Sequence, residues 1–178
     1  MNSGGPDGEI GASMRYLSQR FTAPNRVCMA VLTDVATEEL GHLEMVSTIV
    51  HQLTANLTVE EIENQGFADY YVDHAVGIWP QSAGGIPFNS CEFQSKGDPI
   101  TDMFESMAAE QKARSTYDNI LRVVRDIPEI ADPIRFLRAR EVVHFQRFGE
   151  ALQSLQDQLN SKNFYQMNPS FDIGLTRE

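Results

Sequence analysis

Apolar residues recur at helical spacing through residues 25–55, the most regular stretch of this chain. The stripe consists of Val31, Leu32, Val35, Leu43, Val46, Ile49, Val50 and Leu53. A run of this length with a period near 3.6 residues predicts one long amphipathic helix from about Asn25 to Ala55. Such a helix must bury its apolar face against other elements, so the chain is constrained to pack helices together.

Three further segments show helical spacing as well. They run over about residues 7–21, 99–126 and 133–160. Asp98 and Pro99 form a favourable start for the second of these segments, because aspartate accepts backbone hydrogen bonds at a helix N-cap and proline suits the first helical position. Four amphipathic helices in a chain of 178 residues predict an all-α four-helix bundle.

Residues 66–98 connect the second of the four helices to the third and show no sustained period. The stretch contains several glycines and two prolines, which favour loop structure, and it follows a short helical piece near residues 59–64. A connection this long lets the two flanking helices run in the same direction. We therefore expect a bundle domain over residues 1–160, which includes this crossover, and a C-terminal tail over residues 161–178.

The charge balance excludes two classes of partner. The chain carries 25 acidic and 14 basic residues, a formal net charge of −11, which repels nucleic acid phosphates and anionic membrane surfaces. It has no run of about 20 apolar residues, as a membrane helix requires, and residues 1–8 contain no apolar signal core. Cys28 and Cys91 form no metal-type spacing or disulfide framework, which favours a reducing compartment. We therefore expect a cytoplasmic protein whose partners include neither nucleic acid nor a membrane.

Two of the predicted helices carry a glutamate and a histidine within their apolar stripes. Glu39 and His42 interrupt the stripe of the second helix, and Glu141 and His144 interrupt that of the fourth. Residues three apart share a helix face, so each pair points toward the expected bundle interior. For both pairs, a polar seam or a subunit contact is the plain alternative.

The first and third helices each add one carboxylate. Glu110 lies among apolar residues of the third helix, and Glu9 lies in the opening turn of the first. Taken alone, each has a simpler explanation. Glu110 could pair with Arg114, four residues further on, and Glu9 could complement the helix dipole.

The six residues together match a known arrangement. One glutamate from each of two helices, with Glu-x-x-His from each of the other two, is the pattern of ferritin-like di-iron and di-manganese carboxylate bundles. Buried carboxylates are costly to keep ionised, whereas two divalent cations would neutralise them while imidazoles supply nitrogen ligands. This donor set suits manganese or iron without separating the two metals. The sequence therefore predicts a two-metal site in a ferritin-like four-helix bundle.

Four motifs of the chain resemble those of one protein family. They are Gly4-Gly5-Pro6-Asp7-Gly8-Glu9, Thr37-Glu38-Glu39-Leu40-Gly41-His42-Leu43-Glu44, Ser95-Lys96-Gly97-Asp98-Pro99 and Arg140-Glu141-Val142-Val143-His144. Through these motifs, residues 4–152 resemble the manganese catalases, and within that family the short spore-coat branch of CotJC-like proteins.

The resemblance implies a role for each candidate residue. It implies two manganese ions whose direct ligands are Glu9, Glu39, His42, Glu110 and His144, with one glutamate bridging the ions. Glu141 would be the catalytic residue that takes up and returns protons. Tyr16, two helical turns after Glu9, resembles the family tyrosine that hydrogen-bonds the first glutamate.

The activity implied by the resemblance is the disproportionation of hydrogen peroxide to water and dioxygen. It would belong to a homo-oligomer, a hexamer by resemblance, that is cytoplasmic or lies in the spore coat with other coat proteins as partners. Two alternatives remain open. One is a ferritin-like di-iron oxidase or peroxidase, and the other is a structural coat protein whose metal site is vestigial or purely stabilising.

Overall fold

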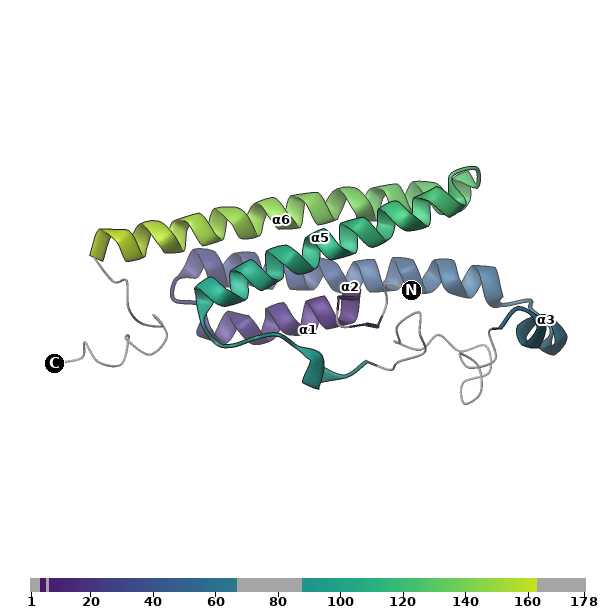
Figure 1. Cartoon of the computed structure of the whole chain (residues 1–178), viewed down its shortest axis with the longest axis horizontal. Helices are drawn as coiled ribbons and strands as arrows, with labels where there is room; N and C mark the ends of the chain where they lie inside the picture. Colours follow the sequence, from purple (N-terminus) through teal and green to yellow (C-terminus); the bar gives the residue numbers. More distant parts are fainter. Residues whose placement is uncertain (1–3, 6, 67–87, 163–178) are drawn as a thin grey trace.

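The computed structural model describes residues 4–5, 7–66 and 88–162. In this part of the chain four helices lie along one another as a bundle (Figure 1), namely α1 (Glu9–Gln19), α2 (Arg26–Thr54), α5 (Pro99–Val124) and α6 (Pro128–Lys162). Shorter helices accompany them, namely η1 (Arg20–Thr22) after α1, α3 (Val59–Asn64) after α2 and η2 (Ser90–Glu92) before α5. None of these helices is both long enough and apolar enough to span a bilayer. The predicted all-α bundle is confirmed.

Side-chain caps fix the starts of α2 and α5. The side chain of Asn25 accepts a hydrogen bond from the backbone N–H of Cys28 at 2.9 Å. Asp98 accepts one from the backbone N–H of Thr101 at 2.8 Å. Pro99 fills the first position of α5, where a missing N–H costs nothing. Both helices therefore begin within a residue of their predicted starts.

The fourth helix is longer than predicted: it begins before Pro133, which lies inside it. α6 begins at Pro128, and the carbonyl of Ile127 accepts a hydrogen bond from the backbone N–H of Ala131 at 2.8 Å. The first turn is therefore closed before Pro133 is reached. Proline removes one backbone hydrogen bond inside a helix, but the uninterrupted helix buries Ala131 and Ile134 in the bundle, which offsets that loss. The predicted start at Pro133 is wrong.

The two helices that flank the crossover run in the same direction, as expected. α2 and α5 point one way along the bundle, and α1 and α6 point the other way (Figure 1). Residues 67–87 of the predicted crossover lie outside the described residues, as do residues 163–178 of the predicted tail. The described end of the crossover is fastened to α1, where Gln19 donates a hydrogen bond to the hydroxyl of Ser95 at 3.1 Å.

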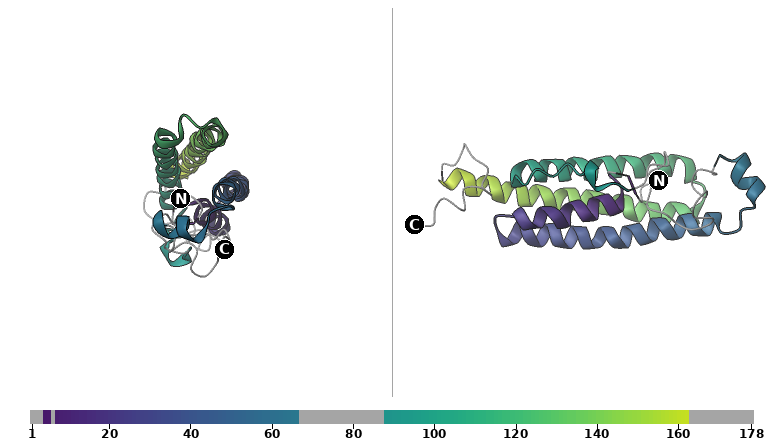
Figure 2. Two further views of the ribbon diagram at one scale, coloured as in Figure 1. Left: turned by 90° about the vertical axis from the view of Figure 1, so that its right-hand side faces the viewer. Right: turned by 90° about the horizontal axis from the view of Figure 1, so that it is seen from below.

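Two apolar clusters fill the bundle. One consists of Ala12, Tyr16, Cys28, Leu32, Val35, Ala36, Met103, Phe148, Ala151, Leu152 and Leu155. The other consists of Val46, Tyr117, Ile134 and Leu137. Seen end-on, the four bundle helices enclose a common centre (Figure 2). Along α2 the first cluster ends at Ala36 and the second begins at Val46, so Glu39 and His42 lie in the interval between the clusters.

Candidate metal centre

Six ionisable side chains lie between the two apolar clusters. Each of these residues is at most 4% exposed to solvent, and all four bundle helices contribute. They are Glu9 of α1, Glu39 and His42 of α2, Glu110 of α5, and Glu141 and His144 of α6. The structure therefore brings together all six residues that the sequence predicts as a two-metal site.

Glu39 lies between the two imidazoles. Its Oε2 atom is 2.8 Å from Nδ1 of His42, and its Oε1 atom is 2.8 Å from Nδ1 of His144. The two imidazole rings are stacked at 17°, with their centroids 5.3 Å apart. One carboxylate thus turns a different oxygen toward each ring, which is the arrangement that a bridging ligand of two metal ions requires.

The other carboxylates are divided between the two imidazoles. Oε2 of Glu9 is 3.8 Å from Nδ1 of His42, and Oε1 of Glu141 is 3.7 Å from the same atom. Oε2 of Glu110 is 3.4 Å from Nδ1 of His144. The cluster therefore has two halves, each with one imidazole nitrogen and at least one carboxylate oxygen, and the two halves share Glu39.

Several ligand-type atoms in the cluster have no hydrogen bond. Among the described residues, no hydrogen-bond partner is found for Oε1 of Glu39, Oε2 of Glu110, Oε1 of Glu141 or Nδ1 of His144. Oε1 of Glu39 and Nδ1 of His144 are close, but their directions do not meet hydrogen-bond geometry. Buried polar atoms without partners are costly, and divalent cations would satisfy them. The residues present therefore fit a two-metal site.

Burial shifts the protonation of the cluster in the absence of metal. It raises the pKa of the Glu9 and Glu39 carboxyl groups, and the charges of neighbouring carboxylates add to this effect. Burial and the nearby Glu110 raise the pKa of Glu141 as well. Burial opposes the charged form of His144, but its contacts with Glu110 and Glu39 raise the pKa of this imidazole to about 10. Without metal, these three carboxyl groups and His144 therefore favour their proton-bearing forms.

Glu38 is a member of the site that the stripe pattern does not reveal. Its Oε2 atom lies 2.8 Å from Nε2 of His144 and accepts a hydrogen bond from Arg140 at 2.7 Å. Burial raises the pKa of Glu38, but these two partners outweigh burial and lower it. A carboxylate on the outer nitrogen of a histidine ligand fixes the tautomer and the ring orientation. Glu38 therefore keeps Nδ1 of His144 directed at Glu39.

The tyrosine contacts differ from the expectation. The hydroxyl of Tyr16 donates a hydrogen bond to Glu110, not to Glu9, and Glu9 receives its hydrogen bond from Tyr117 of α5. Residues seven apart on one helix are separated by about 10 Å along the axis. Tyr16 instead meets the glutamate that lies across from it on α5. The predicted Tyr16–Glu9 contact is wrong.

Comparison with known proteins identifies the family. Residues 2–167 match the family model of manganese containing catalase, which is nearly the whole chain. The chain belongs to the manganese catalase family. All six clustered residues lie within the matched range, and so do Glu38, Tyr16 and Tyr117.

Individual relatives agree with this assignment. Protein CotJC of Bacillus subtilis (strain 168) is 44% identical over 91% of this chain and 85% of that protein. A probable manganese catalase of Clostridium acetobutylicum is 30% identical over 90% of this chain and 71% of that protein. The crystal structure of KatB, a manganese catalase from Anabaena, aligns with a TM-score of 0.78 at 29% identity, covering 87% of this chain and 69% of that one. This match confirms the predicted ferritin-like fold.

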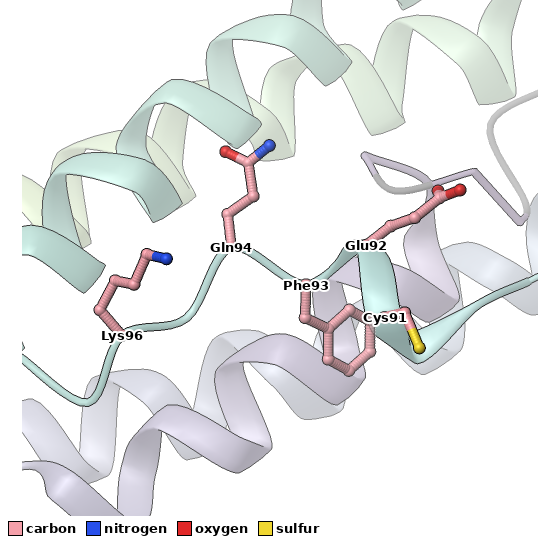
Figure 3. A pocket seen from close by; sticks show the side chains of 5 residues that line it. All are labelled: Cys91, Glu92, Phe93, Gln94 and Lys96. Carbon is pink, nitrogen blue, oxygen red and sulfur yellow. The ribbon is translucent and has the colours of Figure 1, made fainter.

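A surface pocket lies apart from the cluster of carboxylates and imidazoles. It encloses about 530 Å³ and is lined by residues of the segment before α5 (Figure 3), namely Cys91, Glu92, Phe93, Gln94 and Lys96. The pocket contains none of the clustered carboxylates or imidazoles. The Cys91, Gln94 and Lys96 side chains that line it are exposed, and we assign it no chemistry.

Metal binding by this manganese catalase homologue should strengthen as the pH rises. Burial raises the pKa of Glu9 and Glu39, so protons occupy these groups until a metal, which needs deprotonated ligands, displaces them. Calorimetric titration with Mn²⁺ at about pH 6 and about pH 8, in buffers of different ionisation enthalpy, measures both the affinity and the protons released. Equal affinities at both pH values with no proton release would contradict this expectation.

Glu38→Ala should weaken metal binding although Glu38 is not placed among the metal ligands. Loss of the carboxylate on Nε2 of His144 frees that ring, and changes of this kind lower metal affinity by about 10- to 100-fold. The matched control is Glu44→Ala on the same helix, because the Glu44 side chain is exposed. Equilibrium dialysis with Mn²⁺ compares the two variants. Equal affinities for both would contradict the role of Glu38.

Proposed function

We propose that this chain is a dimanganese catalase that converts two molecules of hydrogen peroxide into two of water and one of dioxygen. The observation that carries the proposal is the placement of Glu39, with a different carboxylate oxygen 2.8 Å from each of two buried imidazoles. Membership of the manganese catalase family supports the choice of metal and reaction. The names of two relatives, a probable manganese catalase and KatB, support it further.

The two halves of the cluster suggest which residues hold each ion. Glu9 and His42 would bind one manganese, Glu110 and His144 would bind the other, and Glu39 would bridge the two. Carboxylate oxygens with one imidazole nitrogen per ion suit manganese. The unpartnered oxygens of Glu39 and Glu110, and the unpartnered Nδ1 atom of His144, support this division.

Proton transfer would be carried out by the protein's own residues, and Glu141 is the proposed carrier. When bound, two manganese ions supply a store of two electrons, which one peroxide molecule takes up and a second returns. Oε1 of Glu141 lies 3.7 Å from Nδ1 of His42 and has no hydrogen-bond partner among the described residues. A carboxylate at this position can accept a proton from peroxide and return it to the departing water.

Location and assembly are further parts of the proposal. The 44% identity to Protein CotJC, together with the resemblance to the CotJC-like branch, supports a place in the spore coat beside other coat proteins. The same resemblance supports a homo-oligomer, with six copies as the expected number.

Oxygen release from peroxide tests the proposed function. The protein loaded with manganese should evolve dioxygen, and His42→Ala, which removes one ligand, should not. Activity with iron and none with manganese would instead indicate a di-iron oxidase or peroxidase. A protein that binds two ions per chain and releases no oxygen with either metal would indicate a structural coat protein with a stabilising site.

Glu141→Gln should keep both metal ions and lose most of the rate. An amide cannot carry the proton, and a positioned carboxylate contributes about 10²- to 10⁴-fold in such a step. Metal content and oxygen evolution are measured together, with Glu150→Gln on the exposed face of α6 as the control. Undiminished oxygen evolution would contradict the role, and loss of one ion would make Glu141 a ligand instead.

A further inference from the structure

The first turn of α1 holds Glu9 without a side-chain cap. Glu9 is the first residue of the helix, and Gly8 at the N-cap offers no side chain to accept hydrogen bonds from the turn. Helix ends fray unless their free backbone groups are satisfied. The position of the Glu9 carboxylate must therefore be set by contacts with other helices.

Contacts from α5 to Glu9 and to the segment just before it differ in strength. Lys112 lies 2.9 Å from Asp7, but the two side chains are 47% and 33% exposed, and such pairs contribute little. Tyr117 is fully buried, and its hydroxyl donates a hydrogen bond to Oε1 of Glu9. A buried hydrogen bond to a charged or proton-sharing carboxyl group is among the stronger ones in proteins. Of these two contacts, Tyr117 provides the firmer hold.

The bond from Tyr117 also determines which oxygen faces the cluster. Tyr117 engages Oε1 of Glu9, while Oε2 of the same carboxylate lies 3.8 Å from Nδ1 of His42. The tyrosine thus turns one oxygen away from the imidazole and leaves the other directed at it.

A second tyrosine repeats this arrangement in the opposite sense. Tyr16 of α1 donates to Oε1 of Glu110 on α5, and Oε2 of Glu110 lies 3.4 Å from Nδ1 of His144. Each tyrosine stands seven residues after the glutamate of its own helix and bonds the glutamate of the other helix. Tyr16 belongs to one apolar cluster and Tyr117 to the other. The two contacts are therefore reciprocal, and each orients one carboxylate.

We propose that Tyr117 is a positioning residue that holds Oε1 of Glu9 so that Oε2 is presented beside His42 as a metal ligand. The proposal rests on the two-metal site proposed above. It predicts that loss of the hydroxyl weakens the ion held by Glu9 and His42, while the ion beside His144 keeps its ligands.

The test is Tyr117→Phe, which keeps the buried ring and removes only the hydroxyl. Binding of Mn²⁺ is measured by equilibrium dialysis with elemental analysis, and electron paramagnetic resonance distinguishes coupled ion pairs from single ions. The wild-type chain should bind a coupled pair. The variant should bind one of the two ions about 10- to 100-fold more weakly, with single-ion signals at Mn²⁺ concentrations that saturate the wild type. Far-UV circular dichroism should show unchanged helix content.

A pair of double-mutant cycles separates positioning from packing. If Tyr117 acts through Glu9, Tyr117→Phe should have no further effect on Mn²⁺ affinity in a Glu9→Ala background, which removes the acceptor oxygen. In a Glu110→Ala background, its full effect should persist. Tyr16→Phe should show the opposite pattern, losing its effect beside Glu110→Ala and keeping it beside Glu9→Ala.

The outcomes distinguish this inference from the proposed function. Unchanged Mn²⁺ binding by Tyr117→Phe, or an equal loss in both backgrounds, would overturn the role of Tyr117. A wild-type chain that binds a coupled pair but releases no oxygen would overturn the catalase function alone, and the cycles would still decide the role of Tyr117. A wild-type chain that binds no ion pair would overturn both.

Discussion

Six ionisable side chains share one buried volume in this bundle, and the position of Glu39 decides how they are accommodated. Burial raises the pKa of the Glu9 and Glu141 carboxyl groups beside it, which is the response expected of acids removed from water. Glu39 turns one oxygen to each imidazole at 2.8 Å, so the cluster forms two nitrogen-and-oxygen sets joined by a single carboxylate. Two cations in these sets would relieve the repulsion that burial creates.

The rest of the bundle supports this geometry from outside. An apolar cluster lies on either side of the carboxylates, and each cluster contributes one tyrosine whose hydroxyl bonds a glutamate. Glu38 of α2 contacts the outer nitrogen, Nε2, of His144 on α6. Two buried tyrosines therefore orient Glu9 and Glu110, and a carboxylate orients His144, which is the kind of support that a preorganised metal site requires.

Sequence periodicity predicts the four bundle helices and most of the clustered residues. A polar residue on an apolar stripe can be recognised from its spacing along the sequence alone. The start of α6 differs from the predicted one. Proline at position 133 favours a helix start there, but burial of Ala131 and Ile134 extends the helix back to Pro128. The stripe pattern does not predict the role of Glu38, because this residue lies beside the inner stripe of α2 and not on it. The partner of each tyrosine depends on how α1 and α5 are placed side by side, which spacing along one helix does not contain.

Anomalous diffraction at the manganese edge, from crystals of the protein grown with Mn²⁺, tests the central claim most directly. Two anomalous peaks per chain are expected inside the bundle, one on each side of the Glu39 carboxylate, with His42 beside one and His144 beside the other. A bundle interior without an anomalous peak, in crystals saturated with Mn²⁺, would contradict it.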